Sequence, residues 1–112
     1  MILLVDDDPD ILEGCEMVLE NHGFHVLPCR SGEEALQAFR TYQEEINTII
    51  TDYHMPHMDG LELIQRIRMQ QPHIHTILIS GDFNQALPSG VILLQKPFTM
   101  DVLVQAIEQA SM

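Results

Sequence analysis

The stretch ILLVDDDPDILEGCEMVLENHG, residues 2–23, determines the fold class of this chain. It begins with an unbroken aliphatic run, Ile2–Val5, which is typical of a strand that is buried on both faces of a sheet. Asp8 is a favourable N-cap, Pro9 a favourable first helical residue, and Gly23 a helix stop. Between them, apolar residues recur at helical spacing: Ile11, Leu12, Cys15, Val18 and Leu19. The stretch therefore predicts a buried strand followed directly by an amphipathic helix.

The same strand-and-helix unit repeats along the rest of the chain. Further strands are predicted at Phe24–Leu27, Thr48–Thr51, Thr76–Ile79 and Val91–Leu94. A second helix is predicted to begin at the capping-box pair Ser31 and Glu34. The apolar positions expected to face the core in the later helices are Ala35, Leu36 and Phe39, then Leu63, Ile64 and Ile67, and finally Leu103, Ala106, Ile107 and Ala110. Because parallel neighbours need a crossover connection, this alternation predicts a doubly wound α/β fold with helices on both faces of a parallel sheet.

The composition indicates a single folded domain over residues 1–112. Apolar residues make up 46% of the chain and aromatic residues only 5%, so the core must be aliphatic, and a disordered chain is excluded. No apolar run approaches the length that spans a bilayer, and acidic residues follow too soon for a signal peptide. We therefore expect a cytoplasmic protein without membrane contact.

The chain is strongly acidic, with 17 Asp and Glu residues, 5 Lys and Arg residues and a net charge of −12. A surface of this sign repels nucleic acid phosphates, so direct binding of DNA or RNA is not expected. Cys15 and Cys29 do not form a CxxC motif, and without a secretory signal they are interpreted as buried thiols.

Reactive residue types follow the predicted strands. Asp6–Asp8 follow the first strand, Asp52 the third, Ser80 the fourth and Lys96 the fifth. Ligands of α/β sheets bind beyond the carboxyl ends of the strands, and carboxylates that converge there repel one another unless a cation compensates. Oxygen ligands of this kind suit Mg²⁺. Helix capping is the alternative explanation, and it accounts well for Asp8 but less well for the two acids before it.

Four motifs at these strand ends resemble the receiver domain of two-component response regulators. They are Val5-Asp6-Asp7-Asp8, the segment TDYHMPHMDG over residues 51–60, Ile79-Ser80-Gly81, and Lys96-Pro97-Phe98. The resemblance covers essentially the whole chain. It implies a five-stranded, flavodoxin-like and CheY-like sheet in the order 2-1-3-4-5.

The resemblance implies a role for each matching residue. Asp52 is the phosphoacceptor, whose carboxylate attacks phosphorus to give an acyl phosphate. The cofactor is Mg²⁺, bound by Asp7, by Asp52, by the backbone carbonyl of His54 and, through water, by Asp6. The metal and Lys96 draw charge off the phosphoryl oxygens, which is most of what phosphoryl transfer needs from a protein.

The resemblance also implies a switch. Ser80 closes on the phosphoryl group and draws the following loop inward, because the new dianion forms hydrogen bonds that only one conformation satisfies. The Lys96–Pro97 peptide bond is cis in this family. The phosphoryl donor is a sensor histidine kinase or a phosphotransfer protein, and the output passes to a downstream protein or a parent hybrid kinase. The domain is not an enzyme beyond its own phosphorylation and autodephosphorylation.

Three features depart from the family pattern or vary within it. The segment 81–90 is short and contains a proline and glycines, so the fourth helix is expected to be short or missing. Leu93 stands where relatives carry an aromatic residue that moves on phosphorylation. His54 and Asp82 occupy variable positions that flank the phosphoryl site and influence its hydrolysis.

Two other functions remain as alternatives. One is a docking module that keeps the fold but is not phosphorylated. The other is a small phosphatase with an aspartate nucleophile, which generally needs a cap over its substrate to exclude water. A chain of 112 residues leaves little room for such a cap.

Overall fold

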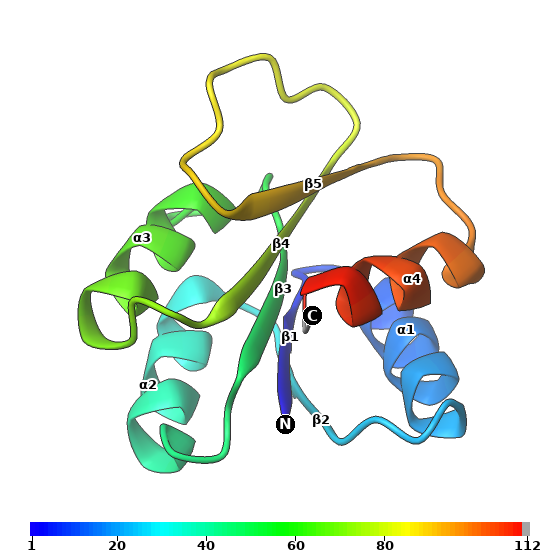
Figure 1. The fold of residues 1–112 in the computed structure, drawn as a ribbon, viewed down its shortest axis with the longest axis horizontal. Coiled ribbons are helices and arrows are strands. Elements are labelled where there is room, and N and C mark those ends of the chain that lie inside the picture. The colour runs from blue at the N-terminus through cyan, green and yellow to red at the C-terminus, as the bar shows by residue number, and fades with distance from the viewer. Residues whose placement is uncertain (111–112) are drawn as a thin grey trace.

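The computed structural model describes residues 1–110 of the chain (Figure 1). The strands in this part are β1 (Ile2–Val5), β2 (Val26–Cys29), β3 (Thr48–Asp52), β4 (His75–Ser80) and β5 (Val91–Gln95). The helices are α1 (Pro9–Asn21), α2 (Gly32–Tyr42), α3 (Gly60–Gln70) and α4 (Met100–Ala110). The strands form one parallel sheet in the order β2-β1-β3-β4-β5, which confirms the predicted fold class.

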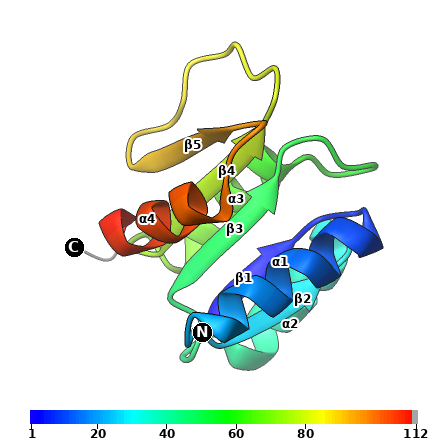
Figure 2. The ribbon, with the colours of Figure 1, turned by 90° about the vertical axis from the view of Figure 1, so that its right-hand side faces the viewer.

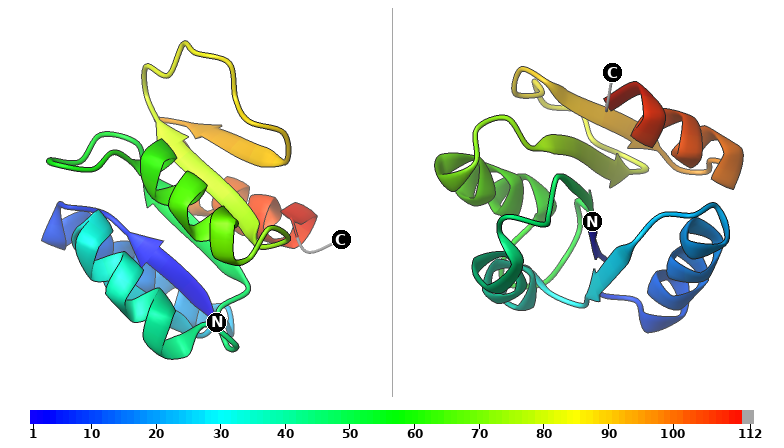
Figure 3. Two further views of the ribbon diagram at one scale, coloured as in Figure 1. Left: turned by 90° about the vertical axis from the view of Figure 1, so that its left-hand side faces the viewer. Right: turned by 60° about the horizontal axis from the view of Figure 1, so that its bottom comes forward.

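Two helices cover each face of the sheet. Helices α1 and α4 lie on one face, and α2 and α3 on the other (Figures 1 and 3). Side chains of β1 alternate between the two faces: Leu3 and Val5 pack in the cluster with α2 and α3, whereas Ile2 and Leu4 pack in the cluster with α1 and α4. Burial on both faces explains why this strand is aliphatic at every position. Within residues 1–110, no helix is long and apolar enough to cross a membrane.

The edge strand β2 lies two residues further along the chain than the sequence predicted. The prediction was Phe24–Leu27, whereas the strand runs from Val26 to Cys29 and includes Pro28. Its bounds follow from its neighbour β1, because Ile2 is in register with Val26 and the pairing continues residue by residue to Val5 and Cys29. A proline is tolerated here because an edge strand has a side without ladder partners.

The predicted helix starts are confirmed. The side chain of Asp8 accepts hydrogen bonds from the backbone N–H groups of the first turn of α1, and Ser31 Oγ accepts one from the N–H of Glu34, 3.1 Å away. The buried stripe of α4 is Leu103, Ala106 and Ile107, while Ala110 is only half-buried at the end of the helix, in contrast to the prediction.

The predicted loss of one helix is also confirmed. Residues 81–90 connect β4 to β5 without a helix, as the loop above β5 in Figures 1 and 2 shows. The loop is nevertheless anchored: Phe83 is buried, and its ring meets that of Tyr53 edge to face with centroids 5.1 Å apart. Gln85 Nε2 also donates a hydrogen bond of 2.9 Å to the hydroxyl of Tyr53.

Gly60 places the start of α3 directly against the end of β3. Its N–H donates a hydrogen bond of 2.9 Å to the carbonyl oxygen of Tyr53. A Cβ atom at this position would overlap the carbonyl oxygen of Asp52 and press on Leu78. Only glycine therefore permits this approach between helix and strand.

We predict that Gly60→Ala lowers the free energy of unfolding by about 1–3 kcal/mol, because backbone atoms of β3 must move to admit the methyl group. The matched control is Gly14→Ala in α1, where a Cβ meets nothing within 4 Å. Gly14 is exposed within a helix, so its replacement should raise stability by about 0.5–1 kcal/mol. Urea denaturation of both variants measures the two effects, and equal effects at both sites would refute the steric argument.

Candidate functional site

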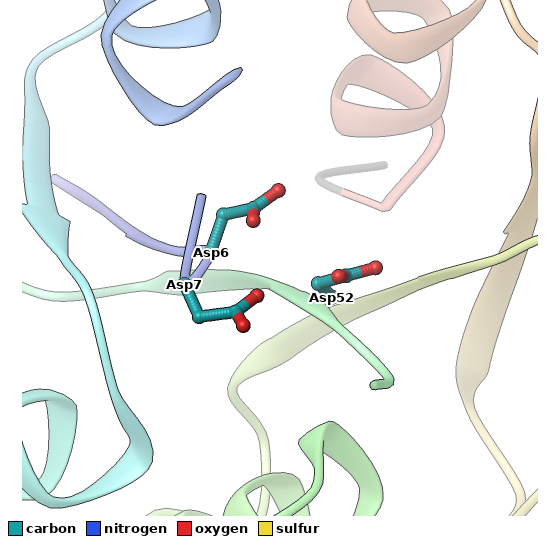
Figure 4. A group of neighbouring side chains, drawn as sticks. All are labelled: Asp6, Asp7 and Asp52. Carbon is teal, nitrogen blue, oxygen red and sulfur yellow. The ribbon is translucent and has the colours of Figure 1, made fainter. Parts of the chain in front are cut away.

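Three carboxylates meet at the carboxyl edge of the sheet. Asp6 and Asp7 directly follow β1, and Asp52 is the last residue of the neighbouring strand β3. One oxygen from each of the three lies within 4.8 Å of the others, and Figure 4 shows the side chains side by side. Among the described residues, 1–110, these three acids form the group whose oxygens lie close enough together to share a metal ion. The carboxylates therefore converge at the strand ends as the sequence predicted.

The acids of this cluster are partly removed from water. Asp6 and Asp52 are 8% and 9% exposed, whereas Asp7 is exposed. Burial raises the pKa of Asp6, and the charge of Asp52 raises it further, against the opposing effect of the hydrogen bond of 2.9 Å from the N–H of Asp8. The cluster is thus a place where negative charge is crowded and poorly solvated.

Lys96 brings a positive charge to the same point. It follows β5, and its Nζ lies 3.3 Å from Oδ1 of Asp52. Its peptide bond with Pro97 is cis, as the family resemblance implied. The sheet therefore brings together Asp6, Asp7, Asp52 and Lys96, although they are spread over most of the sequence.

Ser80 lies at the end of β4, but its hydroxyl group bonds to a residue that the sequence did not assign to it. Ser80 Oγ donates a hydrogen bond to Asp82 Oδ1 at 3.1 Å and accepts one from the N–H of Asp82 at 3.2 Å. The side chain of Ser80 is buried. Ser80 follows Ile79, which is in register with Asp52, and in this structure its hydroxyl is held by the β4–β5 loop.

His54 contacts the same oxygen of the Asp82 carboxylate. Its Nε2 lies 2.6 Å from Asp82 Oδ1, and both side chains are exposed to solvent. This hydrogen bond raises the pKa of His54 and, together with the bond from Ser80, lowers the pKa of Asp82. The sequence placed His54 and Asp82 beside the site but gave no sign that they contact each other, because nothing in a pattern reports a contact between two loops.

An open hollow beside the carboxylates gives access to the site. Its volume is about 420 Å³, and its lining residues are Asp7, Tyr53, His54, Met55, Pro56 and Asp59. A larger hollow of about 750 Å³ lies at the opposite edge of the sheet, around the end of α2 and the loop before β3. The strand-end chemistry belongs to the smaller hollow, since the larger one lies away from the three clustered carboxylates.

Comparison with known proteins gives the same family throughout. The family model described as the response regulator receiver domain matches residues 2–108. The response regulator receiver protein CpdR of Brucella abortus (strain 2308) is 34% identical over 114 residues, which cover 96% of this chain and 93% of CpdR. The transcriptional regulatory protein GlrR of Escherichia coli (strain K12) is 35% identical over 115 residues, covering 97% of this chain. The chain spans about a quarter of the length of GlrR, 26%.

Solved structures agree with the sequence relatives. A response regulator receiver domain protein from Clostridium thermocellum has a TM-score of 0.91 and 32% identity, covering 97% of this chain and 91% of that one. The receiver domain of the hybrid histidine kinase CckA has a TM-score of 0.88 and 29% identity, covering 99% of this chain and 98% of that one. With its sheet order, its strand-end acids and these matches, the chain belongs to the receiver domain family of two-component response regulators.

Proposed function

We propose that this chain is the phosphoacceptor of a two-component phosphorelay, and that Asp52 receives the phosphoryl group. The observation that carries the proposal is the setting of Asp52 at the end of β3, with two further carboxylates within 4.8 Å and the ammonium of Lys96 at 3.3 Å. Membership of the receiver family supports the same assignment.

The chemistry follows from this arrangement. A carboxylate oxygen of Asp52 attacks phosphorus, the bond from phosphorus to the donor nitrogen of a phosphohistidine breaks, and an acyl phosphate forms. Negative charge accumulates on the phosphoryl oxygens during transfer, so the main requirement is positive charge held in position. Lys96 supplies one such charge next to the attacking carboxylate.

The donor set fits a magnesium ion. Three crowded carboxylates with a raised pKa at Asp6 form a site whose repulsion a hard divalent cation relieves. Asp7 and Asp52, the backbone carbonyl of His54 and, through water, Asp6 would hold the ion. Bound there, Mg²⁺ supplies positive charge to the phosphoryl oxygens.

The partners follow from charge and from the relatives. A chain with net charge −12 repels nucleic acid phosphates, so a nucleic acid partner is not expected. A sensor histidine kinase or phosphotransfer protein is the proposed donor. The likeness to the receiver of the hybrid kinase CckA supports a parent hybrid kinase or a separate downstream protein as the recipient.

Two rival functions are less well supported. A docking module without phosphorylation does not explain why the acids and Lys96 converge. A phosphatase for small molecules needs an enclosed site, whereas the hollow beside Asp52 is open to solvent. We therefore propose a switch that catalyses only its own phosphorylation and autodephosphorylation.

The first test is phosphorylation by acetyl phosphate in the presence of Mg²⁺. The wild-type chain should gain one phosphoryl group by intact mass, and Asp52→Asn should gain none because a neutral amide replaces the nucleophilic carboxylate. Asp101→Asn, at an exposed acid of α4, is the matched control and should be labelled like the wild type. Chelation by EDTA should abolish labelling. Stoichiometric labelling of Asp52→Asn would disprove the site assignment.

The acid cluster predicts that replacing Asp6 changes stability differently with and without metal. Asp6→Asn should raise the free energy of unfolding of the metal-free protein by about 1 kcal/mol at neutral pH, because it removes a buried charge. Its side-chain oxygen still accepts the hydrogen bond from the N–H of Asp8. The gain in stability on adding Mg²⁺ should shrink in the same variant.

Thermal denaturation with EDTA and with Mg²⁺ measures both changes. Glu108→Gln on α4 is the control for net charge, since it removes an exposed acid away from the cluster. A metal-free Asp6→Asn protein less stable than the wild type would contradict the proposed repulsion.

Besides its charge during transfer, Lys96 is predicted to act after the phosphoryl group has arrived. Lys96→Ala should still bind Mg²⁺, because the carboxylates are unchanged, but should not convert phosphorylation into a change of conformation. The amide resonances of residues 80–82 provide the measurement. A wild-type pattern of shifts in the phosphorylated variant would remove Lys96 from the mechanism.

A further inference from the structure

The hydroxyl group of Ser80 has one proton, and in this structure that proton has a defined acceptor. Ser80 Oγ donates to Asp82 Oδ1 at 3.1 Å, and the N–H of Asp82 donates back to Ser80 Oγ at 3.2 Å. Ser80 is 1% exposed, so water is not a ready alternative partner for its hydroxyl. The serine is therefore held in place by a single neighbouring residue.

The carboxylate of Asp82 is itself fixed from a second loop. His54, two residues after Asp52, approaches the same oxygen of Asp82 to 2.6 Å. Next to it, Tyr53 holds Phe83 and Gln85 of the β4–β5 loop by an edge-to-face contact and a hydrogen bond. The two residues that directly follow Asp52 thus hold the loop that carries Asp82.

We propose that Asp82 is a positioning residue that holds the Ser80 hydroxyl in the unphosphorylated arrangement and competes with the phosphoryl group for it. The inference rests on the proposed function of Asp52 and on the role that the family resemblance implies for Ser80, which is to close on a phosphoryl group at Asp52. Because the hydroxyl has a single proton, a bond to Asp82 and a bond to a phosphoryl oxygen exclude each other.

This competition sets the free-energy cost of moving the Ser80 hydroxyl to the phosphoryl group. When Ser80 turns to the phosphoryl group, Asp82 keeps its contact with His54, so its carboxylate is not left without a partner. The exchange then costs about one hydrogen bond, which corresponds to about a three- to tenfold effect on the affinity for a phosphoryl group. The exposed His54–Asp82 pair adds little to the stability of the fold, so variants at Asp82 are expected to fold.

The test uses beryllofluoride, which stands in for the phosphoryl group, with saturating Mg²⁺ and amide NMR as the measure of binding. Asp82→Ala should bind beryllofluoride about three- to tenfold more tightly than the wild type, because Ser80 is released. The removal of a negative charge near the site would also tighten binding, so a single variant does not separate the two causes.

A double-mutant cycle with Ser80→Ala separates them. If Asp82 acts through the serine, the increase in beryllofluoride affinity caused by Asp82→Ala should be at least threefold smaller in the Ser80→Ala background. If Asp82 acts by charge alone, the gain should be equal in both backgrounds, and the proposal is wrong. Asp82→Asn serves as the control that removes the charge but keeps an oxygen for Ser80, and it should show only the charge effect.

The outcomes also distinguish this inference from the function on which it rests. Suppose that the wild type binds beryllofluoride, that Asp52→Asn does not, and that the effects in the cycle are additive. This result would overturn the role of Asp82 and leave the phosphoacceptor function standing. A wild type that does not bind beryllofluoride would overturn both. A purely structural effect of Asp82→Ala would lower the thermal midpoint and weaken binding, which is the opposite of the expected gain.

Discussion

The pairing of β3 with its two neighbours is the constraint on which the site depends. Thr51 is in register with Val5 of β1, and Asp52 with Ile79 of β4, so the backbone ladder itself places Asp52 beside Asp6 and Ser80. Hydrogen bonds between buried parallel strands leave little freedom in register, because a slip by one residue would turn every buried side chain to the other face. The backbone positions of Asp52, Asp6 and Ser80 are therefore fixed by the register of the sheet, and their side chains lie at or just beyond the ends of the strands.

The same arrangement brings three negative charges together at one edge of the sheet, in a chain whose net charge is already negative. Two of the three clustered acids are largely buried, and burial makes their repulsion stronger than it would be in water. The ammonium of Lys96 offsets this repulsion at Asp52 but leaves the pKa of Asp6 raised. Stability is in this way given up at the edge of the sheet where we propose that a cation and a phosphoryl group bind.

The sequence was sufficient for those features that depend on local pattern. Continuous aliphatic runs located the buried strands, and the caps at Asp8 and Ser31 located helix starts, since these signals arise within a few residues. The edge strand β2 was misplaced because its bounds are set by β1, which lies more than twenty residues earlier in the chain. The bond from Ser80 to Asp82 and the contact of Asp82 with His54 were not predicted, because they depend on how two loops fold over the sheet.

The missing helix between β4 and β5 changes how far a structural change travels. A helix is stiff along its length, so a displacement at one end is carried to the other as a rigid-body movement. The loop at residues 81–90 lacks that ladder of backbone bonds and is fixed instead at separate points such as Phe83 and Gln85. In the proposed switch, a shift that begins at Ser80 would be absorbed within a few residues of this loop and would stay local. A partner that distinguishes the two states of the proposed switch would therefore have to make contact close to the site itself.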